Sequence, residues 1–202
     1  MLFIQDVLFN PETGHPFQLY SAQIQFVRQA LKLTEDGRFA YPELLFSAPK
    51  KSGKTTLAAM ITLYVVIVLG GRYSEGYCVA NDFEQAQSRV FQAIVRIVEV
   101  SPLLRQSAKI TSSRVEFLST RATITALASD YAGAAGANPT ITVFDELWGY
   151  TSERAHRLWD EMVPVPTRKI SMRLTVTYAG FEGESELLWG LYQRGLKGEK
   201  LA

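Results

Sequence analysis

The fold of this chain is decided by the stretch Leu44-Leu45-Phe46-Ser47-Ala48-Pro49-Lys50-Lys51-Ser52-Gly53-Lys54-Thr55-Thr56. Its apolar beginning, residues 44–46, is typical of a short buried strand, and a loop of small, basic and proline residues follows. From Gly53 onward the chain enters an apolar segment, residues 57–69, that is typical of a helix. A strand, a loop and a helix N-terminus in this order predict a phosphate site, because backbone N–H groups and the positive end of the helix dipole face the loop.

The loop has the spacing of the P-loop motif, with one departure: the glycine that begins the motif is replaced by Ala48. Gly53 lets the backbone approach phosphate without a Cβ. Lys54 is expected to reach the β- and γ-phosphates of ATP, and the Thr55 hydroxyl to coordinate Mg²⁺. The residues expected to bind the nucleotide here are Ala48, Pro49, Lys50, Lys51, Ser52, Gly53, Lys54, Thr55 and Thr56.

A second feature lies far along the chain, in the segment TITVFDE at residues 140–146. Its β-branched and aromatic residues are typical of a buried parallel strand. Two adjacent carboxylates follow at the C-terminal end, where ligands bind in open α/β sheets. Asp145 is expected to hold Mg²⁺ through its water shell, and Glu146 to orient and polarise the water that attacks the γ-phosphate.

Each feature also has a simpler interpretation. The loop could be a solvated basic turn in which Ser52 caps the helix, and the two acids could be the solvated end of an ordinary strand. Together, however, Lys54 and Thr55 supply phosphate and metal ligands while the acids supply a second metal ligand and a base. The combination favours nucleotide hydrolysis over both simpler interpretations.

Composition places the chain among ordinary globular proteins, since 47% of its 202 residues are hydrophobic and 20% are charged. The net charge of +1 provides no global basic field, so a DNA partner would depend on local patches or on another domain. Cys78 is the single cysteine and is expected to be a core residue in a reducing compartment. No signal peptide is expected, and residues 57–69 are too short to span a bilayer, so no membrane association is expected.

The order of the other segments predicts an α/β fold with a parallel sheet built from right-handed crossovers. Strands are expected at residues 76–80, 123–127 and 172–178, a hairpin at 108–111 and 115–118, and helices at 83–100, 152–162 and 185–191. We expect one domain over residues 1–202, with an N-terminal helical, adenine-side segment (1–40), a core (41–180) and a C-terminal helical tail (181–202).

Three further features have open interpretations. Gln23, on a helix that begins near Tyr20, could read the adenine edge through its amide, but by itself a solvated helix glutamine is preferred. Thr177, at the end of the last strand, could hydrogen-bond the attacking water or the γ-phosphate and report hydrolysis to the following segment. The small residues at 131–139 form either a flexible connector or a loop lying against nucleotide or DNA. His156 lacks partners at metal-ligand spacing, so no zinc site is expected.

These motifs, in this order, resemble the ATPase domain of the large terminase subunit of tailed bacteriophages, the motor that packages viral DNA. The segments that carry the resemblance are APKKSGKT (48–55), VANDFEQA (79–86), GANP leading into VFDELW (136–148) and TVTYAG (175–180). They fall within a region of roughly residues 17–190.

The resemblance implies a P-loop NTPase of the additional-strand, catalytic-glutamate class, with a mainly parallel central sheet flanked by helices. By the same match, Glu146 is the catalytic glutamate, Asp145 the Mg²⁺ ligand, Thr177 the coupling residue and Gln23 the adenine contact. It implies ATP and Mg²⁺ as cofactors, and partners comprising double-stranded DNA, a portal protein, a small terminase subunit and further copies of the chain in a ring. The compartment it implies is the host cell cytoplasm.

The chain departs from the family in two ways. Relatives carry an arginine inside the P-loop that stabilises transition-state charge, whereas the matching residue here is Lys50, which supplies charge without a forked guanidinium. Arg154, Arg157 or a residue of a neighbouring subunit are the other candidates for that role. Relatives also continue into a nuclease domain that has no counterpart here, so ATPase activity without DNA cleavage is expected, with the nuclease on a separate domain or chain.

Two other interpretations stay open from the sequence. One is another P-loop DNA translocase or helicase-like ATPase, which shares this site but needs motifs that the chain lacks. The other is a nucleotide-binding scaffold that does not hydrolyse ATP, for which Ala48 is the motivation.

Overall fold

The computed structural model describes residues 2–79, 88–127, 136–181 and 183–198. Its strands are β1 (Glu43–Ser47), β2 (Glu75–Val79), β3 (Ala108–Ile110), β4 (Arg114–Phe117), β5 (Ala122–Leu127), β6 (Ile141–Asp145) and β7 (Met172–Thr177). Its α-helices are α1 (Ser21–Ala30), α2 (Lys54–Tyr64), α3 (Arg89–Val100), α4 (Pro102–Ser107), α5 (Glu153–Glu161) and α6 (Glu186–Lys197). Short turns of π- or 3₁₀-helix are η1 (Phe3–Val7), η2 (Val65–Leu69) and η4 (Leu147–Gly149).

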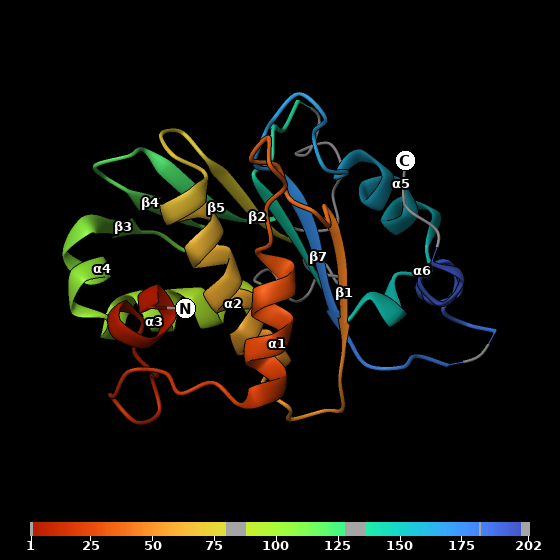
Figure 1. The fold of residues 1–202 in the computed structure, drawn as a ribbon, viewed down its shortest axis with the longest axis horizontal. Helices are drawn as coiled ribbons and strands as arrows, with labels where there is room; N and C mark the ends of the chain where they lie inside the picture. Colours follow the sequence, from red (N-terminus) through yellow and green to blue (C-terminus); the bar gives the residue numbers. More distant parts are fainter. Residues whose placement is uncertain (1, 80–87, 128–135, 182, 199–202) are drawn as a thin grey trace.

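The described strands form one seven-stranded sheet in the order β1-β7-β6-β2-β5-β4-β3 (Figure 1). The pairs from β1 to β5 are parallel, whereas β4 and β3 form an antiparallel hairpin that adds to β5. The predicted hairpin and mainly parallel sheet are therefore confirmed. β7 lies between the P-loop strand β1 and the acidic strand β6, which is the additional strand expected of this class.

Two hydrophobic clusters cover the faces of the sheet. One contains most of α2 and α3 with Val143 of β6, and the other contains α5 and η4 with Phe144, the next residue. Because successive strand residues face opposite sides, Asp145 lies on the same side of β6 as Val143, toward α2. The sheet thus directs the first acid of the DE pair toward the P-loop helix.

The helix after the P-loop, α2, has no distinct polar face, because most of its residues are buried. Every residue from Leu57 to Leu63 is buried, and η2 continues the helix until Gly70. The chain then returns into β2, where Cys78 is buried as predicted. Among the described residues, no helix is long and apolar enough to cross a membrane.

The end of the C-terminal helix differs from expectation. The C-terminal helix was expected at residues 185–191, but α6 runs from Glu186 to Lys197 and ends at Gly198, whose φ is 68°. Gly195, which was expected to follow the helix, is part of it, since a glycine weakens a helix without necessarily ending it. The helix expected at 83–100 is confirmed from Arg89 onward, and its first residues lie outside the described part, as do residues 131–135 of the small-residue loop.

Candidate nucleotide site

The loop between β1 and α2 presents backbone N–H groups to the open end of the helix. Gly53 precedes α2 with a φ of 79°, in the left-handed region that glycine adopts without strain. Its carbonyl accepts the first helical hydrogen bond, from the Leu57 N–H at 2.9 Å. The N–H groups of the first turn, at Lys54, Thr55 and Thr56, point out of the helix end, and an anion there is stabilised by them and by the helix dipole.

Lys54 and Glu146, which are far apart in the sequence, meet in space. The Lys54 Nζ lies 3.3 Å from Glu146 Oε1, and Lys54 is only 5% exposed. The other carboxylate oxygen, Oε2, accepts a hydrogen bond from Trp148 Nε1 at 2.9 Å. The P-loop and the acidic strand therefore converge on one place, as the sequence predicted.

The backbone also holds Glu146 in an unusual conformation. Its φ and ψ of 55° and 51° are left-handed, which is uncommon for a residue with a side chain and costs about 1 kcal/mol. Its N–H donates to the Val176 carbonyl of β7 at 2.8 Å, and its carbonyl accepts from the Gly149 N–H at 3.0 Å. These bonds turn the chain out of β6 and aim the Glu146 side chain at Lys54.

Asp145 has the features expected of a carboxylate that shares a metal ion with other ligands. The residue is 6% exposed, and its Oδ1 is buried without a hydrogen-bond partner among the described residues. Burial, and then the neighbouring Glu146 carboxylate, raise the pKa of Asp145 to about 6, while Lys54 and Arg89 act in the opposite direction. An orphaned carboxylate oxygen of this kind fits Mg²⁺, a hard cation that prefers oxygen ligands and keeps several waters.

The described residues contain no group of three or more His, Cys, Asp or Glu side chains that could hold a metal alone. Mg²⁺ would instead share Asp145 and the Thr55 hydroxyl with phosphate oxygens and water, which is its usual arrangement at nucleotide sites. Thr55 is half-buried in the first turn of α2.

Thr177 connects the P-loop to β7 through its main chain. It is fully buried and pairs in register with Ser47, and its carbonyl accepts from the Ala48 N–H at 3.0 Å. Its hydroxyl donates to the Tyr178 carbonyl at 3.0 Å. The structure thus places Thr177 beside the start of the P-loop, and its coupling role stays a prediction.

Lys50 is an exposed residue of the loop whose ammonium group lies over Tyr178. Its Nζ lies 4.9 Å from the centre of the Tyr178 ring, and the Lys54 Nζ lies 5.6 Å from the same centre. Tyr178 therefore contacts two P-loop ammonium groups. Pro49, Lys51 and Ser52 are exposed around it. Arg157, an alternative source of charge, pairs with Glu153 on the outer side of α5.

Trp148 and Tyr178 are functional candidates for which the sequence suggested no individual role. Both lie in the segments that carried the resemblance; Tyr178 directly follows β7, and Trp148 lies three residues after the end of β6. Their rings pack at 5.3 Å between centres. An aromatic residue one to three positions after a strand end that carries site residues is the sequence signal that could have pointed to them.

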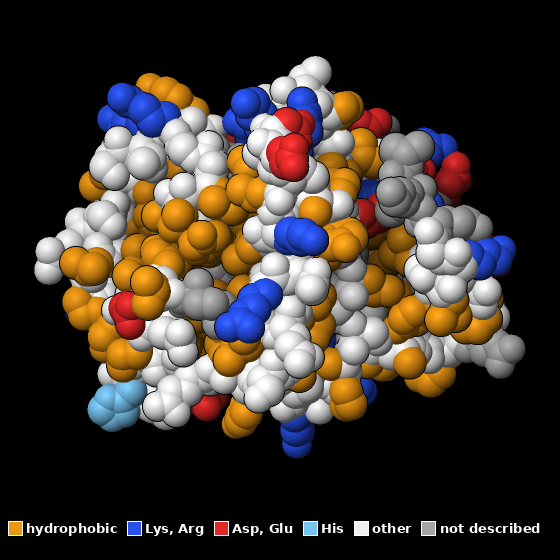
Figure 2. Space-filling view, in the orientation of Figure 1, with side chains coloured by type: hydrophobic (Ala, Val, Ile, Leu, Met, Phe, Trp, Pro, Cys, Tyr) orange, Lys and Arg blue, Asp and Glu red, His pale blue; other side chains and the backbone are white. Residues whose placement is uncertain are grey.

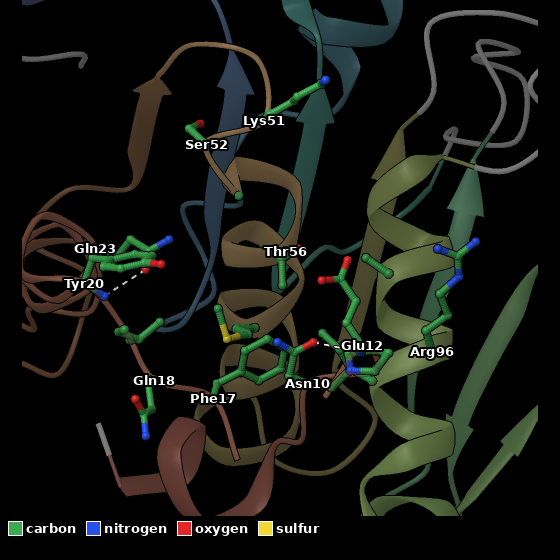
Figure 3. A pocket seen from close by; sticks show the side chains of 16 residues that line it. Asn10, Glu12, Phe17, Gln18, Tyr20, Gln23, Lys51, Ser52, Thr56 and Arg96 are labelled. Carbon is green, nitrogen blue, oxygen red and sulfur yellow. Dashed lines mark hydrogen bonds between the residues drawn. The ribbon is translucent and has the colours of Figure 1, made fainter. Parts of the chain in front are cut away.

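A cavity of about 550 Å³ lies beside the P-loop (Figure 3). Its volume is suited to a small ligand. Tyr20 and Gln23 line it from one side, and Glu12 and Arg96 from the other. The P-loop and α2 also contribute to its lining, through Lys51, Ser52, Gly53 and Thr56.

The Gln23 amide is already partly engaged in this cavity. Its Oε1 accepts a hydrogen bond from the Tyr20 N–H at 3.0 Å. Its Nε2 lies beside the P-loop, since a Cβ added to Gly53 would be 3.5 Å from it. The cavity therefore offers a base mainly the donor half of the amide, rather than both halves as the sequence suggested.

Comparison with known proteins agrees with this geometry. Residues 35–188 match the family described as "Terminase large subunit, ATPase domain". The large terminase of HK97 bacteriophage superposes with a TM-score of 0.78 at 19% identity, covering 98% of this chain and 40% of that one. No curated protein matches the sequence.

The Thermus phage P74-26 large terminase ATPase domain gives a TM-score of 0.50 at 16% identity, covering 82% of this chain and 67% of that chain. A variant of the same domain gives 0.51 at 16% identity, over 84% and 69%. At such identities the likeness shows the fold, which is that of a P-loop NTPase.

The chain spans about 40% of the length of the HK97 protein. The family match contains the P-loop, both acids and Thr177, whereas Gln23 lies before its first residue. Since that match covers well over half of the sequence, the predicted resemblance is confirmed, and the chain belongs to the family of terminase large subunit ATPase domains.

Proposed function

We propose that this chain hydrolyses ATP and that hydrolysis drives double-stranded DNA into a procapsid. The observation that carries the proposal is the contact between Lys54 Nζ and Glu146 Oε1 at 3.3 Å. Lys54 binds phosphate and Glu146 orients the attacking water, so in-line attack on a γ-phosphate requires both side chains to face the same nucleotide site. The family match supports the same conclusion.

Each site residue has a role in this chemistry. The N–H groups after Gly53 and the Lys54 ammonium bind the β- and γ-phosphates, and Asp145 and Thr55 hold Mg²⁺, which neutralises charge on the phosphate oxygens when bound. Glu146 orients the attacking water and accepts its proton.

The neighbouring residues support this chemistry. Lys50 supplies further positive charge beside Lys54, in place of the arginine of its relatives. Thr177 transmits the state of the phosphates to the segment after β7, and Gln23 contacts the adenine in the cavity beside the P-loop. The lining of that cavity supports adenosine as its occupant, because the P-loop forms one of its walls.

The partners follow from the family and are part of the proposal. They are double-stranded DNA, a portal protein, a small terminase subunit and further copies of the chain in a ring, in the host cell cytoplasm. Any DNA cleavage belongs to a separate nuclease domain or chain. On the face shown in Figure 2, the described Lys and Arg side chains are scattered and form no single basic patch.

Phosphate release tests the proposal. The purified chain is incubated with MgATP, with and without double-stranded DNA, beside Glu146→Gln and a control, Glu99→Gln, which changes an exposed carboxylate on α3. We expect wild type and Glu99→Gln to release phosphate alike, and Glu146→Gln to bind ATP but to release phosphate at least about 100-fold more slowly. Equal ATP binding with no release by any variant would instead support the non-hydrolysing scaffold.

A further inference from the structure

The indole of Trp148 is the second partner of the Glu146 carboxylate. Trp148 Nε1 donates to Oε2 at 2.9 Å, while Oε1 faces Lys54 Nζ at 3.3 Å. The two oxygens therefore have different partners. A donor that meets an ionised carboxylate makes a stronger hydrogen bond than one between neutral groups, so this contact can fix the orientation of the side chain.

The Lys54 partner cannot be permanent if ATP is the substrate. Lys54 must turn its ammonium to the phosphates, which leaves Oε1 without its cation. The Trp148 N–H donates to Oε2 and does not bind phosphate. Nucleotide binding therefore does not require this hydrogen bond to break. The carboxylate would then be anchored through one oxygen and have the other free for water.

The position of Trp148 is itself fixed from three sides. Its ring packs against Tyr178 at 5.3 Å and edge-on against Phe181 at 6.0 Å, and its carbonyl accepts from Ser185 Oγ at 2.9 Å. Gly180 permits this packing, because a Cβ there would lie 3.0 Å from Trp148 Cβ and 2.6 Å from Ser185 Oγ. The contacts belong to the segment after β7, which also carries the cation-binding face of Tyr178.

We propose that Trp148 is the positioning residue for Glu146: it holds Oε2 in both the free and the nucleotide-bound state, so that exchange of Lys54 from Oε1 to phosphate exposes a single, oriented oxygen to the attacking water. The proposal rests on the proposed ATP hydrolysis and deepens it. It also connects the catalytic carboxylate to the segment after Thr177, because Trp148 packs against both.

Steady-state kinetics with a double-mutant cycle tests the role. Trp148→Phe keeps an aromatic ring between Tyr178 and Phe181 but removes the N–H donor, and Trp189→Phe, an exposed residue of α6, is the matched control. We expect Trp148→Phe to lower kcat about 10- to 100-fold, the effect of losing one hydrogen bond to a charged group, with KM and the nucleotide Kd within about twofold of wild type. In the Glu146→Gln background the same substitution is expected to have no further effect on kcat.

Two results would overturn the role of Trp148 while leaving ATP hydrolysis intact. One is a kcat of Trp148→Phe equal to that of Trp189→Phe. The other is the same loss of kcat in the wild-type and Glu146→Gln backgrounds, which would mean that Trp148 acts independently of the carboxylate. A wild-type chain that releases no phosphate contradicts the proposed function instead.

A spectroscopic measurement tests Trp148 without any hydrolysis. The chain has three tryptophans, so each indole N–H resonance can be assigned by Trp→Phe substitution. We expect the Trp148 N–H to be protected from solvent exchange in the free chain and with Mg²⁺ and a non-hydrolysable ATP analogue, and to lose that protection in Glu146→Ala. Loss of protection on adding the analogue to wild type would show that the hydrogen bond breaks with the Lys54 contact and would overturn the proposal.

Discussion

At the scale of one residue, the Asp145 carboxylate lies in an environment that disfavours its charged form. Its carboxylate is buried, has an oxygen without a partner among the described residues, and stands next to a second carboxylate. Each of these conditions disfavours the ionised form and would be relieved by a divalent cation. A bound Mg²⁺ is therefore expected to offset the destabilisation that the ionised Asp145 carboxylate causes in the folded chain.

The raised pKa of Asp145 determines the pH range in which its carboxylate destabilises the folded chain. Its pKa is about 6 in the folded chain against an ordinary value of 3.8, so the folded state binds more protons between these values. Without nucleotide, its contribution to stability is therefore present below about pH 4 and is lost as the pH rises through about 6. We expect Asp145→Asn to be more stable than wild type at pH 7.5, by on the order of 2–3 kcal/mol, and to have no such advantage near pH 4.

Urea unfolding at the two pH values, with Asp6→Asn, an exposed carboxylate of η1, as control, measures this difference. The control is expected to follow wild type at both. If Asp145→Asn were less stable than wild type at pH 7.5, the ionised Asp145 carboxylate would not destabilise the folded chain, and the prediction would be wrong. Nucleotide must be left out, because MgATP binding would stabilise wild type selectively.

At the scale of elements, the edge strand β1 must be held firmly because the P-loop begins at its end. Its first residue, Glu43, pairs with Arg173 of β7 at 2.6 Å between Oε1 and Nη2, and both side chains are almost wholly buried. Arg173 also donates to the Trp159 carbonyl at 2.7 Å and lies 3.6 Å from the centre of that ring. One guanidinium therefore connects β1, β7 and α5.

We expect Arg173→Leu to lower the free energy of unfolding by about 3–5 kcal/mol, because it leaves the Glu43 carboxylate buried without its cation. Arg121→Leu, which breaks an exposed pair with Glu116, is the matched control and is expected to cost less than about 1 kcal/mol. Chemical denaturation measures both. Equal losses would mean that solvent reaches the Glu43–Arg173 pair and that it does not secure β1.

The helices and strands differ in how far they could be predicted from the sequence. Periodicity and turn residues predicted the hairpin of β3 and β4, the P-loop helix and the strand that ends at Asp145, because each depends on residues close together in the chain. The insertion of β7 between β1 and β6 followed from the family resemblance alone, since strand order is set by long-range packing. Helix α6 continues beyond Leu191 and through Gly195 because Tyr192, in its next turn, packs against the second hydrophobic cluster, and tertiary packing outweighs the weak local preference of a glycine.

The residues of the site could also be predicted where they belong to local motifs, but not where they depend on the path of the chain. Lys54, Asp145 and Glu146 have motifs with a chemical reason for their spacing, and the sheet brings them together. The contacts of Trp148 and Tyr178 depend on the left-handed conformation at Glu146 and on the path after β7, which no local pattern specifies. The engagement of Gln23 by the Tyr20 N–H likewise depends on how α1 begins.

At the scale of the whole molecule, the chain spans about 40% of the length of the HK97 large terminase, and its assembly into a ring is part of the proposed function. Two cationic groups of the proposed site come from the same chain. Lys50 and Lys54 both lie over the Tyr178 ring of their own chain. This arrangement favours a charge-stabilising residue supplied in cis by Lys50 over an arginine supplied by a neighbouring subunit.

Mixing inactive variants distinguishes the two sources of charge. We expect Lys50→Ala to lower the ATPase rate about 100-fold or more, since loss of a transition-state cation in this class of enzyme is at least that costly, while Lys32→Ala, an exposed control, leaves it unchanged. Adding Glu146→Gln chains, which hydrolyse no ATP but retain Lys50, is expected to restore nothing, because a cis residue cannot be supplied by a neighbour. Recovery of phosphate release in the mixture would mean that Lys50 acts across the subunit interface, and the Lys50–Tyr178 contact would then be a resting position that assembly of the ring replaces.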